Sequence, residues 1–188
     1  MNTDIKSYHL SRIYGKIIGI ITEETLGRTN HENEWASYED RPAARAVITN
    51  TLSEVALMHV ANGGYYKLPG GGIDEGESAV EALRRELKEE VGLDVLDEIA
   101  ELGVVLEYRE EWSRRGVHYC YAVEAGQEPG EPERTPKEID EDYEVVWAKD
   151  IDHAIRLVES GSPKKYGQDF ERARELEVLR YLRGGLGG

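Results

Sequence analysis

The segment that most constrains this chain of 188 residues is 71–93, which reads GGIDEGESAVEALRRELKEEVGL. Its pattern predicts an α-helix that ends near Gly92, where a C-cap glycine is expected. Residues three and four apart share a helix face, so Glu86, Glu89 and Glu90 should point the same way. Carboxylates this close repel one another unless a cation lies between them. Mg²⁺ prefers such oxygens and usually also binds substrate phosphates, so the segment predicts a divalent-metal site.

A second side of the same helix predicts that the acids line a cleft. Four apolar residues recur at spacings of three and four and form a stripe next to the acidic face: Val80, Leu83, Leu87 and Val91. This stripe should anchor the helix on the core beside the carboxylates. Before the helix, residues 67–72 read KLPGGG. Their glycines allow a close backbone approach to an ion or a phosphate.

Segment 71–93 resembles the Nudix box at every fixed position of that motif. The spacing is a glycine, five residues, a glutamate, seven residues and then Arg-Glu-Leu-x-Glu-Glu-x-Gly-Leu. The resemblance implies an α+β fold, the Nudix-type α/β/α sandwich with a mixed β-sheet, over about residues 41–160. It also implies an enzyme, a Mg²⁺-dependent pyrophosphohydrolase in which Mn²⁺ can substitute.

The resemblance also implies a role for each matching residue. Glu89 and Glu90 correspond to the principal metal ligands, and the carbonyl of Gly70 is a further candidate ligand. Glu86 corresponds to a residue that serves as a ligand or as the general base in different members, so the identity of the base stays open. We therefore take Glu86, Glu89 and Glu90 as the catalytic residues. Four motif residues are expected to be structural: Gly71, Glu77, Arg85 and Gly92.

Two groups of residues outside the motif complete the expected site. The family often takes another carboxylate from a distant loop, and in the acidic run 137–144 Glu138 is the first choice and Glu141 the second. Arg45, Lys67 and Arg109 are the candidate phosphate-binding cations, with Arg41 as a further one. Arg45 lies in the middle of a predicted strand, and alternation of strand faces leaves open whether it points outward or into the cleft.

Composition limits the partners and the compartment. The net charge of −15 argues against a nucleic-acid backbone or an anionic membrane as the main partner. Cys120 is the only cysteine, so no disulfide can form within the chain, and we expect a cytoplasmic protein. Cys120 lies in an apolar run and is expected to be a small buried residue. No stretch resembles a signal peptide or a membrane span, so neither is expected.

Hydrophobic patterning predicts three parts. Residues 1–40 form an N-terminal extension with one strand near 13–22, residues 41–160 form the hydrolase domain, and residues 161–188 form a C-terminal helix with a glycine-rich tail. Strands are expected at 44–49, 54–60, 96–108, 117–124 and 143–147, and helices at 150–159 and 169–183. The extension and the last helix are candidate contacts for a homodimer.

Three functions remain open from the sequence. The leading one is cleavage of a diphosphate linkage in a nucleoside diphosphate derivative, such as a non-standard or oxidised nucleoside triphosphate. The second is hydrolysis of ADP-ribose, a nucleotide sugar or a dinucleoside polyphosphate. The third is a non-catalytic module that senses a ligand, which the intact motif disfavours. Neither the base or sugar recognised nor the phosphorus attacked follows from the sequence.

Overall fold

The computed structural model describes residues 10, 12–29, 35–95, 99–126, 129–133, 139 and 142–185. Within this part of the chain, seven strands form one mixed sheet in the order β1-β5-β6-β2-β3-β4, and β7 also pairs with β3. The strands are β1 (Ile17–Ile21), β2 (Glu39–Asn50), β3 (Val55–Val60), β4 (Tyr65–Lys67), β5 (Ile99–Arg109), β6 (Arg114–Ala125) and β7 (Tyr143–Ala148).

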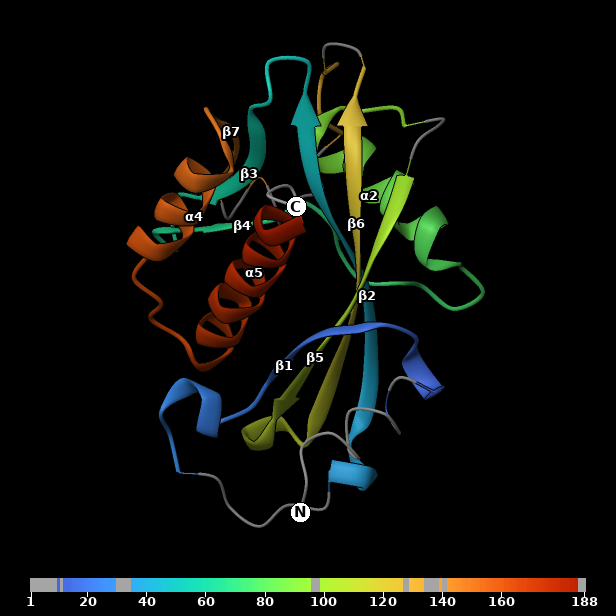
Figure 1. The fold of residues 1–188 in the computed structure, drawn as a ribbon, viewed down its shortest axis with the longest axis vertical. Coiled ribbons are helices and arrows are strands. Elements are labelled where there is room, and N and C mark those ends of the chain that lie inside the picture. The colour runs from blue at the N-terminus through green and yellow to red at the C-terminus, as the bar shows by residue number, and fades with distance from the viewer. Residues whose placement is uncertain are drawn as a thin grey trace.

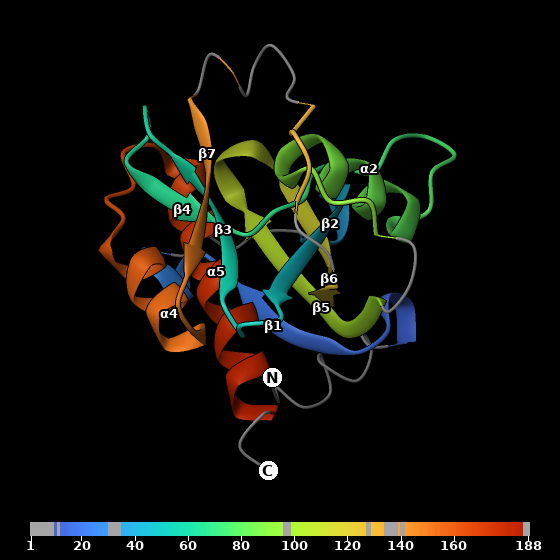
Figure 2. The ribbon, with the colours of Figure 1, turned by 90° about the horizontal axis from the view of Figure 1, so that it is seen from above.

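Helices cover both faces of this sheet. The α-helices whose full extent lies within the described residues are α2 (Ala79–Val91), α4 (Ile151–Ser160) and α5 (Tyr166–Gly185), and the 3₁₀ turns there are η1 (Glu24–Leu26), η2 (Trp35–Ser37) and η3 (Glu110–Trp112). Figures 1 and 2 show α2 on one side of the sheet and α4 with α5 on the other. The predicted α+β class, with a mixed sheet between helical layers, is therefore confirmed.

The alternation of side chains along β2 builds two cores. Ala44, Ala46 and Ile48 face α2 and are fully buried with Leu83 and Leu87 of that helix. The intervening Val47 belongs to the opposite core, which includes apolar residues of α4 and α5. The stripe expected on α2 thus anchors the helix, as its spacing predicted.

Strands β2 and β3 separate almost at once, and this separation opens the sheet. They pair through Thr49 and Val55 next to their connecting turn. Farther along β2, the glycine loop takes the place of β3: the backbone N–H of Ala44 donates to the carbonyl of Gly71, and that of Ala46 to Pro69. The loop is therefore fixed beside β2 at the opening.

The outer elements join the same structure. β1 pairs in parallel with β5, so the strand expected near residues 13–22 extends the sheet. α5 packs with Phe170 and Leu179 fully buried on the face that it shares with α4. Cys120 is also fully buried, as expected, and burial raises the pKa of its thiol to about 12.

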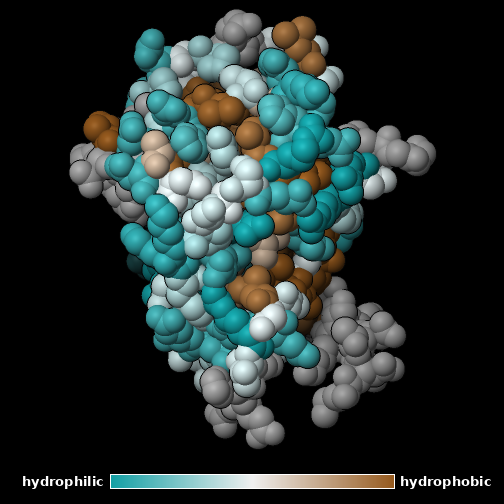
Figure 3. Space-filling model, turned by 90° about the vertical axis from the view of Figure 1, so that its left-hand side faces the viewer, coloured by the Kyte–Doolittle hydropathy of each residue, from teal (hydrophilic) through white to brown (hydrophobic). Residues whose placement is uncertain are grey.

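The surface on the α4 side is mainly polar. Figure 3 shows hydrophilic side chains over most of this face, with apolar residues visible between them in separate areas. No helix in the described part of the chain is long and apolar enough to cross a membrane.

Candidate functional site

Both ends of α2 are fixed by local chemistry. Ser78 is the N-cap, and its side chain and that of Glu81 exchange hydrogen bonds with each other's backbone N–H groups in a capping box. Gly92 ends the helix in the left-handed region with φ +73°, as expected for a C-cap glycine. The acidic residues of α2 therefore start from a helix whose length and direction are set by its own sequence.

Arg85 ties this helix to the loop before it. Its guanidinium donates two hydrogen bonds of 3.0 Å to the carboxylate of Glu77 and a third of 3.0 Å to the carbonyl of Gly72. The same side chain reaches Glu86 at 2.8 Å and Glu89 at 3.5 Å. A planar guanidinium can satisfy several acceptors at once, so Arg85 also offsets the repulsion among these carboxylates.

Glu86 packs directly against the glycine loop. A Cβ atom on Gly71 would lie 2.0 Å from Oε1 of Glu86, so the carboxylate occupies the space that a side chain would need. Burial raises the pKa of Glu86, and the nearby charge of Glu90 adds to this, although the hydrogen bond from Arg85 opposes it. The structure thus gives a physical reason for glycine at position 71.

Glu90 is almost completely buried and has two cationic or polar partners. Its Oε2 accepts a 2.6 Å hydrogen bond from the backbone N–H of Gly70, and its Oε1 lies 2.9 Å from Nζ of Lys67. Gly70 has φ +126°, and a Cβ atom there would lie 2.2 Å from the carbonyl oxygen of Ala44. Only glycine therefore fits where the loop crosses β2 and meets Glu90.

These groups open into a cleft of about 470 Å³. One wall comes from the glycine loop, β2, β4 and α2, and its polar side chains include Arg45, Lys67, Glu86 and Glu90. The orientation of Arg45, which the sequence left open, is therefore into the cleft. A volume of this size suits a ligand as large as a nucleotide.

The carboxylates of this wall have the chemistry that a hard dication requires. Glu86 and Glu90 are adjacent, buried oxygen donors, and Arg85 and Lys67 balance their charge. Among the described residues, no three His, Cys, Asp or Glu side chains are grouped closely enough to hold a metal ion as they stand. Nζ of Lys67 lies 2.9 Å from Oε1 of Glu90, so a metal bound by this carboxylate would compete with Lys67.

Two other residues expected in the site do not line the cleft. Glu89 is held by Arg85 and is not among the residues that line the cleft. Arg109 also lies outside the lining, since Glu107 binds its guanidinium at 2.6 Å. Glu138 lies outside the described residues, as does the second choice, Glu141.

The opposite wall of the cleft was not anticipated from the sequence. It is formed by Trp112 of η3, by Lys165 just before α5, and by Gly167, Gln168, Glu171 and Arg174 of α5. Arg174 gives the signal that could have revealed it. An arginine lies between Phe170 and Val178 on the buried face of a helix, and a buried arginine needs partners in the interior.

Those partners form a buried ionic network behind the cleft. Arg174 lies 2.8 Å from Glu107 and 2.5 Å from Glu175, and His118 lies 3.3 Å from Glu107. Burial alone would raise the pKa of Glu107, but its contacts with His118, Arg174 and Arg109 hold it well below its usual range. Desolvation lowers the pKa of His118 to about 4, so its imidazole is uncharged at neutral pH.

Comparison with known sequences gives one family and several short matches. A NUDIX domain model matches residues 39–162. An RNA pyrophosphohydrolase of a Nitratiruptor species is 61% identical over 36 residues, which are 19% of this chain and 23% of that protein. One of Ectopseudomonas mendocina is 42% identical over 57 residues, 30% of this chain and 36% of that protein. The chain thus spans only about a quarter to a third of these curated relatives.

Solved structures match over much more of the chain. An ADP compounds hydrolase superposes with a TM-score of 0.53 and 26% identity, over 81% of this chain and 76% of that one. The NUDIX domain of Shewanella oneidensis NrtR, crystallised with ADP ribose, has a TM-score of 0.57 and 19% identity over 87% and 97% of the two chains. At that identity the second match shows the fold alone.

Proposed function

Because the chain belongs to the Nudix family, we propose that it is a divalent-metal-dependent pyrophosphohydrolase that cleaves a diphosphate linkage in a nucleoside diphosphate derivative. The observation that carries this proposal is the first wall of the cleft. Buried Glu86 and Glu90 lie there with Arg45 and Lys67, so acids able to hold a metal share one cavity with cations able to bind phosphates.

The metal expected is Mg²⁺, with Mn²⁺ as a substitute. Glu86 and Glu90 would hold it, with Glu89, the Gly70 carbonyl and Glu138 as further candidate ligands. When bound, such an ion neutralises phosphate oxygens and makes water easier to deprotonate. The chain's own groups supply the remaining requirements of the reaction.

Each of these groups has a task that follows from its position. Arg45 and Lys67 orient the diphosphate by binding its oxygens, since both side chains reach the cleft. Glu86 has an alternative role because burial raises its pKa: where it does not bind the metal, it can accept a proton from the attacking water. Arg85 holds the loop and helix in register through Glu77, so it supports the chemistry without touching the substrate.

The substrate class has two candidates among small nucleotides. A nucleoside triphosphate with a non-standard or oxidised base is one, and ADP-ribose, a nucleotide sugar or a dinucleoside polyphosphate is the other. The resemblance to an ADP compounds hydrolase favours the second. RNA with a 5′-triphosphate is less favoured despite the short matches, because a net charge of −15 opposes binding of a long polyanion. We further propose a cytoplasmic enzyme that forms a homodimer.

A hydrolysis panel tests this proposal. The purified chain is incubated with each of the substrates above, with Mg²⁺, Mn²⁺ or EDTA, and the products are identified by mass. We expect metal-dependent release of a nucleoside monophosphate from at least one small nucleotide. Absence of turnover on the whole panel with either metal would reject the enzymatic function and favour a ligand-sensing module.

A further inference from the structure

The two walls of the cleft differ in chemistry. The wall from β2, β4, α2 and the glycine loop carries the carboxylates and the cations already described. The wall from η3 and α5 presents an indole, that of Trp112, whose residue is 43% exposed although it is large and apolar. An aromatic ring left open at the mouth of a polar cleft offers a flat apolar surface to a ligand.

The indole of Trp112 is held in one orientation by three neighbours. Tyr166 meets it edge to face, with ring centroids 5.2 Å apart. The guanidinium of Arg109 lies 5.2 Å from the ring centroid, and Glu107 fixes that guanidinium in turn. At Gly167 a Cβ atom would come within 2.6 Å of Cη2 of the indole, so α5 makes room for the ring.

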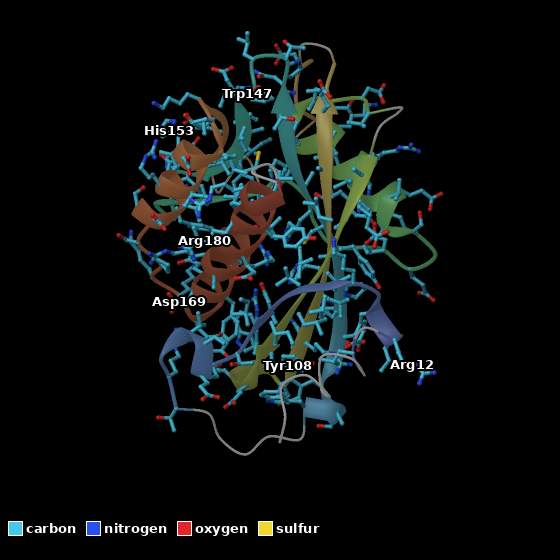
Figure 4. All side chains as sticks on the ribbon, viewed as in Figure 1. Arg12, Tyr108, Trp147, His153, Asp169 and Arg180 are labelled. Carbon is cyan, nitrogen blue, oxygen red and sulfur yellow. The ribbon has the colours of Figure 1, made fainter. Side chains whose placement is uncertain are left out.

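The start of α5, which carries these neighbours, is itself anchored. The hydroxyl of Tyr166 donates to Glu23, and Arg28 forms an ion pair with Asp169. Figure 4 shows Asp169 at the end of α5 that faces the N-terminal segment. The indole therefore rests on a support that is tied to the sheet and to the segment around η1, and little mobility is lost when a ligand binds it.

Charge assigns the two walls to different parts of a nucleotide. Glu171 and Lys165 both line the α5 wall, and their opposite charges leave phosphate no net attraction there. Arg174 lines it too, but its charge is paired with Glu107 and Glu175. On the other wall Lys67 is paired with Glu90, whereas Arg45 donates to the backbone carbonyl of Ala44 and keeps its charge for a phosphate. A diphosphate should therefore bind at the glycine loop, and the rest of the nucleotide should extend towards Trp112.

We propose that Trp112, supported by the first turn of α5, is the stacking platform for the base of the nucleotide substrate. The inference rests on the proposed function for the identity of the ligand as a nucleotide. It assigns base recognition to residues 112 and 167, one of which lies beyond the segment 39–162 matched by the family model. Stacking tolerates any base, so Trp112 provides affinity for a nucleotide without selecting one base.

Binding without turnover tests this inference. ADP, GDP and inorganic pyrophosphate are titrated calorimetrically in EDTA into the wild type and into Trp112→Phe, Trp112→Ala and Gly167→Ala. For the two nucleotides we expect Trp112→Ala to weaken binding about tenfold or more, and Trp112→Phe to weaken it much less. Gly167→Ala should also weaken nucleotide binding, because its new methyl group moves the indole out of position although Trp112 itself is unchanged. Binding of pyrophosphate, which has no base, should not change.

Fluorescence gives a second readout. ADP should quench the tryptophan fluorescence of the wild type and of a matched Trp147→Phe control. This quenching should be lost in Trp112→Phe. Equal affinity of Trp112→Ala and wild type for ADP and GDP would overturn the inference, and so would a parallel loss of pyrophosphate binding. Hydrolysis that does not depend on Trp112 would reject the stacking role of Trp112 but retain the proposed enzymatic function. Nucleotide binding that depends on Trp112, without any hydrolysis, would reject the proposed enzymatic function but support the stacking role of Trp112.

Discussion

Nζ of Lys67 lies 2.9 Å from Oε1 of Glu90, and the same ammonium group sits 4.4 Å from the ring centroid of Tyr143. The lysine thus neutralises a carboxylate that a metal ion would also bind. Binding of a metal ion and a substrate would separate this ion pair. The metal would bind Glu90, and the released Lys67 would bind a substrate phosphate. Substitution of either partner tests this exchange.

Replacing Glu90 by Gln should abolish metal-dependent hydrolysis. The amide can still accept the hydrogen bond from the N–H of Gly70, but it is a weak ligand for Mg²⁺. We expect kcat to fall by about 100-fold or more, with a circular dichroism spectrum like that of the wild type. Glu101→Gln, at an exposed position on β5, is the matched control and should keep full activity. Retained activity in Glu90→Gln would remove Glu90 from the site.

Replacing Lys67 by Met should separate metal binding from substrate binding. Without the ammonium group, no ion pair with Glu90 has to be broken before a metal binds. The substrate-free protein should therefore bind Mn²⁺ a few-fold to about tenfold more tightly. The same variant should have a higher KM, because one phosphate-binding cation is gone. Calorimetric titration of Mn²⁺ and steady-state kinetics measure the two effects. Weaker Mn²⁺ binding would show that Lys67 does not compete with the metal.

Adjacent glycines provide a matched pair in the loop. A methyl group at residue 71 would overlap the carboxylate of Glu86, whereas one at residue 72 would meet nothing within 4 Å. We expect Gly71→Ala to lower Mn²⁺ affinity and kcat by about tenfold or more, because Glu86 must move. Gly72→Ala should bind Mn²⁺ like the wild type. The prediction fails if the two variants have the same Mn²⁺ affinity.

The buried network behind the cleft should make stability depend on pH. The folded-state pKa of His118 is about 4, below its ordinary value near 6.5, so the unfolded chain binds the proton more tightly between these limits. The contribution of His118 to the free energy of unfolding is therefore fully present above about pH 6.5. It decreases by up to a few kcal/mol as the pH falls towards 4. Below about pH 4.5, protonation of Glu107 adds to the loss, since its pKa is also lowered by folding.

Urea unfolding at about pH 7, 6, 5 and 4.5 measures this decrease. In His118→Gln the free energy of unfolding should vary less over the same range, although the variant is less stable at neutral pH. His153→Gln controls for the loss of a histidine, because His153 lies on α4, at the outer side of the molecule (Figure 4). If the free energy of unfolding of His118→Gln changed with pH as much as that of the wild type, the pH dependence would come from other groups.

The first wall could be predicted from the sequence because its information is local. The capping box, the glycines and the acids of α2 lie within the short segment 71–93, and helix period fixes which of them share a face. Position along a helix does not decide contacts, however. Glu89 was expected beside Glu86 and Glu90; in the structure it shares Nη1 of Arg85 with Glu86, at 3.5 and 2.8 Å, but it is not among the residues that line the cleft.

The second wall could not be predicted because it depends on packing between distant segments. Arg109 was expected to bind phosphate, but Glu107 binds its guanidinium; Glu107 lies two residues before it on the same face of β5, and that spacing could have indicated an ion pair. The apolar stripe of α5 was recognised, whereas the meeting of its first turn with Trp112 requires the folded sheet. Periodicity identifies a buried face but does not identify its partner.

The cleft takes its two walls from segments that are synthesised at different times. The acids of the first wall end at Glu90, whereas the second wall includes Arg174 of α5. The carboxylates and the glycine loop therefore leave the ribosome well before α5 does, and a nascent chain can begin to order its sheet while the cavity still lacks one side. Docking of α5 is then the step that makes the protein able to enclose a ligand.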